Sequence, residues 1–176
     1  MKFVSENFKD LRSLYINQLR TLLSVEEHIV RAWPNMVTMA TDEQLRQAFQ
    51  SHLQETEVHI KRLEGLLAAA KGLDRSIEST SPHKCKAITA LIAEADDMML
   101  DARNAYVRDA ALIATAQRVE HYEIAIYGAV RHFARVLGES SAAEILDKTI
   151  KEEGHADHVL TSIAERVNVD ATKTAA

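Results

Sequence analysis

The chain has 176 residues, which suits a single domain, and 47% of them are hydrophobic and 27% charged, as in an ordinary folded protein. Only two prolines and five glycines occur, too few for the frequent turns of a β-sandwich or barrel, so we expect an all-α protein. The net charge of −5 argues against a nucleic-acid-binding surface, and the single cysteine excludes a network of disulfides within the chain. No apolar run approaches the roughly 18 residues that span a membrane, and residues 1–10 lack the apolar stretch of a signal peptide, so we expect a cytoplasmic protein.

The helix-breaking residues predict five helices, at residues 5–40, 43–70, 84–102, 106–137 and 139–167. Pro34 either kinks the first helix or splits it into two pieces. A polar linker at 72–83 separates two hairpins of long helices, and the short third helix follows it. We therefore predict one ferritin-like four-helix-bundle domain over residues 1–167, with a short extra helix in the crossover, and a flexible tail at 168–176.

Carboxylates interrupt the apolar faces of the long helices. On a helical wheel, Glu26 falls at the centre of the apolar stripe of the first helix. Glu123 lies on the centre line of the fourth helix, with Glu120 on its flank. Glu153 and Asp157 lie in the middle of the stripe of the fifth helix. Each of these acids is near the middle of its helix, so antiparallel packing would bring them to one level of the bundle.

The second helix carries His52, Thr56 and His59 on its apolar stripe and Glu55 towards one rim. Buried carboxylates cost several kcal/mol each unless they are paired, and the stripes of the four helices offer no Lys or Arg for pairing. We therefore expect metal ions, and carboxylates with one or two imidazoles suit iron or manganese. His52 either binds metal or hydrogen-bonds in the core beside it, and we favour the second interpretation.

Three segments, at residues 52–56, 108–114 and 117–125, resemble the YciF/YciE family of bacterial stress proteins, which belongs to the ferritin-like superfamily. The resemblance extends from about residue 7 to residue 167, and its most specific part is the Val-Glu-His-Tyr-Glu stretch at 119–123. In that superfamily, which includes the rubrerythrins, two metals are held by a Glu on the first helix, Glu-x-x-His on the second, one or two Glu on the third bundle helix and Glu-x-x-His on the last.

By position, the resemblance implies metal ligands at Glu26, Glu55, His59, Glu120, Glu123, Glu153 and Asp157. Two positions depart from the superfamily pattern. Val58 stands three residues after Glu55, so the nearest histidine is His59 at i+4. Ala156 stands three residues after Glu153, so the next ligand-type residue is Asp157, also at i+4. Both spacings remain on one helix face, and the resulting site is richer in carboxylate than the usual pattern.

Two hypotheses for function follow. In the first, two metal ions, iron before manganese, react with peroxide or oxygen under stress, as in a di-metal peroxidase or catalase-like oxidoreductase. Electrons would come from an electron-donor protein, or the reaction would be a dismutation, because the chain has no Cys-x-x-Cys module. In the alternative, the protein binds iron without catalysis, or is a structural stress protein whose metal only stabilises the bundle. The resemblance also implies a homodimer.

Overall fold

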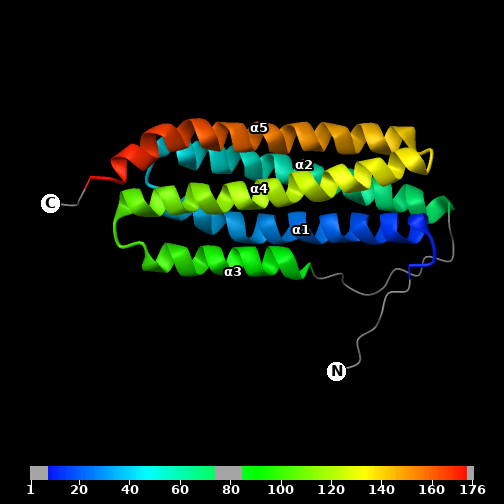
Figure 1. The fold of residues 1–176 in the computed structure, drawn as a ribbon, viewed down its shortest axis with the longest axis horizontal. Coiled ribbons are helices and arrows are strands. Elements are labelled where there is room, and N and C mark those ends of the chain that lie inside the picture. The colour runs from blue at the N-terminus through cyan, green and yellow to red at the C-terminus, as the bar shows by residue number, and fades with distance from the viewer. Residues whose placement is uncertain (1–7, 74–84, 174–176) are drawn as a thin grey trace, which may run out of the picture.

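The computed structural model describes residues 8–73 and 85–173, and these residues form five α-helices and no strand. The helices are α1 (Leu11–Met39), α2 (Glu43–Leu73), α3 (Lys86–Asp101), α4 (Ala105–Val136) and α5 (Ser140–Asp170). Helices α1, α2, α4 and α5 pack as an elongated four-helix bundle, and α3 lies outside it against α1 and α4 (Figure 1). The predicted all-α bundle with a short extra helix in the crossover is confirmed.

The crossover exists because α2 and α4 run in the same direction along the bundle (Figure 1). After α2, the chain must return over the length of the bundle before α4 can begin, and α3 covers the part of this return nearest α4. Helix α2 continues to Leu73, beyond its predicted end at 70. The rest of the predicted linker, residues 74–83, lies outside the described residues.

The ends of α1 and α4 follow from local chemistry. Helix α1 begins at Leu11 rather than at residue 5, because Asp10 accepts a hydrogen bond from the Ser13 amide at 2.7 Å and forms a capping box with it. Pro34 lies inside an uninterrupted α1, so the alternative of two separate helices is wrong. Gly138, with a φ of 78°, follows α4 in the left-handed conformation that glycine adopts most readily.

The turn between α1 and α2 is fixed by a residue of a distant helix. Asp109 of α4 is buried and accepts hydrogen bonds from the backbone amides of Thr41, at 2.8 Å, and Asp42, at 2.9 Å. The Thr41 hydroxyl donates to the same carboxylate. This contact caps the start of α2 and sets its position relative to α4.

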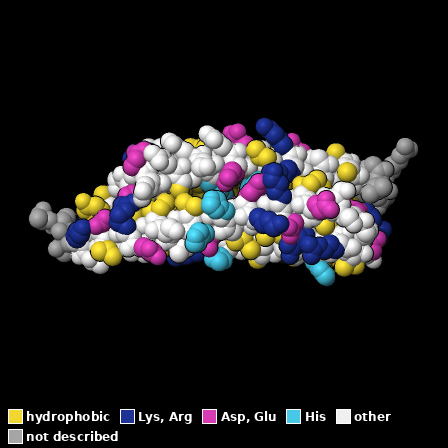
Figure 2. Space-filling view, turned by 90° about the horizontal axis from the view of Figure 1, so that it is seen from above, with side chains coloured by type: hydrophobic (Ala, Val, Ile, Leu, Met, Phe, Trp, Pro, Cys, Tyr) yellow, Lys and Arg dark blue, Asp and Glu magenta, His cyan; other side chains and the backbone are white. Residues whose placement is uncertain are grey.

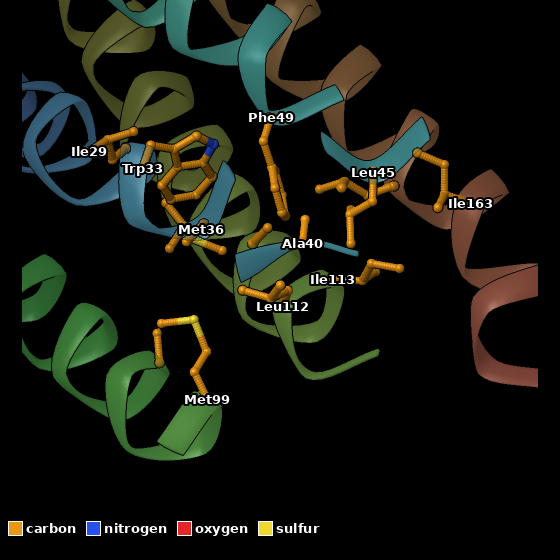
Figure 3. Packing of buried hydrophobic residues seen from close by; sticks show 14 of the residues in the cluster. Ile29, Trp33, Met36, Ala40, Leu45, Phe49, Met99, Leu112, Ile113 and Ile163 are labelled. Atoms are coloured by element: carbon orange, nitrogen blue, oxygen red, sulfur yellow. The ribbon is translucent and has the colours of Figure 1, made fainter. Parts of the chain in front are cut away.

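Two apolar layers fill the bundle, one towards each end. The Trp33 layer contains Trp33, Phe49, Leu112 and Ile163 among others, and α3 contributes Met99 to it (Figure 3). In this layer the rings of Trp33 and Phe49 meet edge to face, with centroids 5.9 Å apart. The Tyr15 layer comprises the buried hydrophobic residues at the other end, Tyr15, Ile16, Leu19, Leu22, Leu63, Leu66, Leu67, Ala70, Tyr127, Val130, Ala134, Ala143 and Leu146.

Among the described residues, no helix has the length and apolar composition needed to cross a membrane.

Candidate metal centre

Between the two apolar layers, the four long helices bring six ionisable side chains into the interior. Helix α1 supplies Glu26, α2 supplies His52 and His59, α4 supplies Glu120 and Glu123, and α5 supplies Glu153. His52 is 5% exposed, and the other five side chains are exposed by 1% or less. The helical wheel predicts this burial for the four glutamates, since each lies on or beside the apolar stripe of its own helix.

The six side chains form two groups with one member in common. His52, Glu120, Glu123 and Glu153 each offer one ligand atom, and these atoms lie within 4.8 Å of one another. Glu26, His59 and Glu153 form the second such group.

The two oxygens of Glu153 face different histidines. Oε1 lies 2.9 Å from His59 Nδ1, and Oε2 lies 3.9 Å from His52 Nδ1. A carboxylate in this position can contribute one oxygen to each of two metal ions. The arrangement would suit two metal ions, with Glu153 common to both groups of ligand atoms.

The hydrogen-bonding state of these groups tests whether they fit metal ions. In the described part of the chain, most of the buried polar side-chain atoms without a hydrogen-bond partner belong to these six residues. Both oxygens of Glu123 and both ring nitrogens of His52 are among them. His59 Nδ1 also has none, because its approach to Glu153 lacks hydrogen-bond geometry. Such buried atoms cost about 1–3 kcal/mol each when nothing pairs with them. Metal ions would satisfy them together.

Charge gives a second test of the fit. Four carboxylates carry four negative charges, which equals the positive charge of two divalent ions. Burial and then the neighbouring His59 lower the pKa of His52 to about 3, so this imidazole is neutral near pH 7 and has a lone pair to donate. The donor set is four carboxylates and two imidazoles, and it suits iron or manganese better than a thiolate site would.

Crowding of the carboxylates shifts their own titration. Burial, and then the charges of neighbouring glutamates, raise the pKa of Glu123 and of Glu120 well above the ordinary value. Burial raises the pKa of Glu153 to about 7, a rise that His59 opposes and Glu26 reinforces. Burial alone would lower the pKa of His59, but Glu153 and Glu26 raise it to about 10. Without a bound cation, Glu120, Glu123 and His59 therefore keep their protons to higher pH than the same groups in water.

Residues outside the six orient two of them. Tyr127 of α4 donates a hydrogen bond from its hydroxyl to Glu26 Oε1. The Nε2 atom of His59 lies 3.1 Å from Glu152 Oε2, and Arg62 donates to both oxygens of that carboxylate. A proton on Nε2, hydrogen-bonded to Glu152, leaves a lone pair on His59 Nδ1, which lies 2.9 Å from Glu153 Oε1 and 3.6 Å from Glu26 Oε1.

Two residues of the predicted ligand set lie outside both groups. Glu55 is half-buried and lines a cavity that reaches His52 and Glu120. Asp157 is 21% exposed, and its Oδ1 accepts a hydrogen bond from Gln117 at 3.1 Å. Both residues are one turn from the centre on their own helices, but each is only half-buried.

The structure also brings to the centre residues that the helical wheel did not assign to the metals. His52 lies in a group of ligand atoms, although we favoured a place for it beside the metals. The sequence spacing could have predicted this placement. His52 and His59 are seven residues apart and so lie on one face of α2, two turns from each other. The Glu152–Arg62 pair could not be predicted in this way, since each residue lies at a rim and only the packing of α2 on α5 joins them.

Comparisons with known proteins agree with this architecture. The family described as "Domain of unknown function (DUF892)" matches residues 10–173. Protein YciF from Escherichia coli (strain K12) is 37% identical over 158 residues, which cover 90% of this chain and 92% of YciF.

Two solved structures are also similar over most of their length. The crystal structure of the E. coli stress protein YciF matches with a TM-score of 0.83 and 36% identity, covering 91% of this chain and 98% of that one. YcfI from Rhodopseudomonas palustris, described as a candidate structural protein, matches with a TM-score of 0.81 and 34% identity, covering 90% of this chain and 98% of its own. The chain therefore belongs to the YciF family, that of the domain of unknown function DUF892.

Proposed function

We propose that this protein holds two iron or manganese ions between its helices and reacts with peroxide or oxygen under stress. The observation that carries the proposal is the pair of buried groups that share Glu153, whose ligand atoms are largely without hydrogen bonds. One apolar layer lies on each side of this level of the bundle. The similarity to the E. coli stress protein YciF supports the connection with stress.

Redox-active metals bound here would supply electron transfer to oxygen or peroxide. The protein's own residues would hold the metal ions and orient their ligands. Glu120, Glu123 and His52 would hold one ion, Glu26 and His59 the other, and Glu153 both. Tyr127 fixes one oxygen of Glu26 through its hydroxyl, and the Glu152–Arg62 pair holds the His59 ring. Neutral His52 keeps a donor available at physiological pH.

The alternative is a protein whose metal stabilises the bundle without turnover. One comparison favours it, because YcfI from R. palustris is described as a candidate structural protein. The same centre serves both functions, since metal ions that satisfy buried carboxylates on four helices also bind those helices to one another. The homodimer, the electron-donor partner and the cytoplasmic location expected from the sequence stay predictions.

Metal analysis followed by a peroxide assay tests the proposal. Protein purified from its own host should contain about two iron or manganese ions per chain. Oxygen evolution on adding hydrogen peroxide, or peroxide consumption with a reductant, would support the catalytic function. Bound metal with neither reaction would favour the structural alternative, and metal-free native protein would contradict both.

A further inference from the structure

A cavity of about 100 Å³ lies between α2 and α5, next to the candidate metal centre. Figure 2 looks onto this face of the bundle, where hydrophobic side chains line the hollow between the helices and histidine side chains lie beside it. Its apolar walls include Phe49 of α2 and Ala156 of α5. The cavity has room for a few water molecules, since each occupies about 30 Å³ in the liquid.

The inner end of this cavity is formed by two members of the centre. His52 and Glu120 both line it, and both are at least nine-tenths buried. In the described part of the structure, the two ring nitrogens of His52 and Oε2 of Glu120 have no hydrogen-bond partner. These atoms are therefore free to receive a ligand that arrives through the cavity.

The outer end of the cavity offers a carboxylate and an imidazole, as the inner end does. Glu55 is half-buried and His155 is exposed, and both line the cavity. None of the described residues that line the cavity is a Lys or Arg. A cation would be attracted to such a mouth and an anion repelled.

We infer that this cavity is the entry path for divalent metal ions, with Glu55 and His155 as the first ligands at its mouth. The inference rests on the proposed metal centre. An ion that leaves water must exchange hydration oxygens for protein donors, and the cavity offers carboxylate and imidazole at both ends with room for remaining waters between. Glu55 thereby acts in delivery and not as a permanent ligand, in agreement with its place outside both buried groups.

Trp33 supplies a reporter for this step. It is the only tryptophan of the chain, and its ring centroid lies 5.5 Å from that of His52. Co²⁺ has a partly filled d shell and quenches indole fluorescence at short range, so its arrival at the centre can be followed in time. The final extent of quenching reports binding at equilibrium, and the rate reports entry.

The experiment mixes chelator-treated protein with Co²⁺ in a stopped-flow fluorimeter. Glu55→Gln should load at least about threefold more slowly than the parent, because the mouth loses a charge that attracts cations, while final quenching and cobalt content stay the same. Ala156→Leu, which narrows the cavity, should also slow loading without changing the end point. The matched controls are Glu57→Gln on the exposed face of α2 and Ala125→Leu on the exposed face of α4.

Three outcomes would overturn the inference. The inference is overturned if Glu55→Gln loads at the parent rate. It is also overturned if Glu57→Gln is slowed as much as Glu55→Gln, because that would indicate a general surface field. Unequal final cobalt content in Glu55→Gln would make Glu55 a permanent ligand instead. If the parent itself binds no cobalt, the proposed metal centre fails, a result that differs from normal binding with unchanged rates.

Discussion

The apolar layers and the polar level between them are built from the same four helices but satisfy their side chains in different ways. In the Trp33 layer, Trp33, Phe49 and Leu112 belong to one packed apolar cluster. This packing stabilises the fold without a bound ligand or ion. At the polar level, Glu123 and Glu153 are equally buried, yet their oxygens have no hydrogen-bond partner among residues 8–73 and 85–173. The two apolar layers therefore stabilise the fold, whereas the unpaired polar groups between them destabilise it, as expected of a functional site.

The comparison predicts the largest effect in the apolar layers. Leu112→Ala should lower the free energy of unfolding by about 2–5 kcal/mol, through lost burial and a cavity, by similar amounts with and without chelator. The control is Leu100→Ala, since Leu100 is 79% exposed and its replacement should change stability by no more than about 0.5 kcal/mol. Chemical denaturation measures both. A loss at Leu112 that appeared only in the presence of metal would contradict the independence of this layer.

At the polar level the effect should change sign with metal. Glu123→Gln keeps the volume but removes a carboxylate, so bound metal should fall sharply and the loaded protein should become less stable. The chelated protein should gain about 1–3 kcal/mol, because one unpaired buried acid is gone. Glu27→Gln, one residue away and exposed, should change neither property.

An ordinary buried ion pair would behave differently from this prediction. Removing one partner would then destabilise the protein with and without chelator. Thermal melts of the parent, Glu123→Gln and Glu27→Gln, together with their metal contents, distinguish the two cases. Equal metal content in all three proteins would remove Glu123 from the site.

A smaller effect is expected one step outside the centre. Glu152→Gln weakens the contact that orients His59, so metal affinity should fall by about 10–100-fold, which corresponds to about 1.4–2.7 kcal/mol. Glu144→Gln, on the exposed face of α5, is the control. Equilibrium titration with Co²⁺, followed by Trp33 fluorescence, measures both variants. Unchanged affinity in Glu152→Gln would show that His59 needs no such support.

The last prediction concerns the effect of pH on the stability of the metal-free protein. The raised pKa values of Glu120, Glu123 and His59 mean that the folded chain holds protons that the unfolded chain releases. Stability should therefore fall as pH rises from 6.5, the ordinary histidine value, towards the His59 pKa of about 10. His52 acts in the opposite direction, but only between its pKa of about 3 and 6.5.

The expected slope is about 1.4 kcal/mol per pH unit for each proton released. Urea unfolding of chelated protein at several pH values above 6.5 measures it. Glu123→Gln should show a shallower slope than the parent, because one of the titrating groups is missing. Constant or rising stability over this range would contradict the assignment of protons to the buried cluster.

The sequence by itself determined the positions of the helices and the burial of four glutamates. Periodicity and breakers predict five helices within a few residues, and only the capping box at Asp10 moves a predicted start by more than two residues. The wheel places Glu26, Glu123 and Glu153 on the apolar stripes and Glu120 on the flank of one, and all four are buried. The angle of a residue about its own helix axis follows from sequence spacing alone.

Only the tertiary structure decided what those side chains meet. Whether a side chain at this level joins the centre depends on where the neighbouring helix lies. His52 joins the centre, whereas Glu55, one turn away on the same helix, lines the cavity. The role of Asp109 likewise appears only when α4 is placed beside the turn before α2. Spacing along one helix cannot supply such information, because contacts between helices depend on their crossing and register.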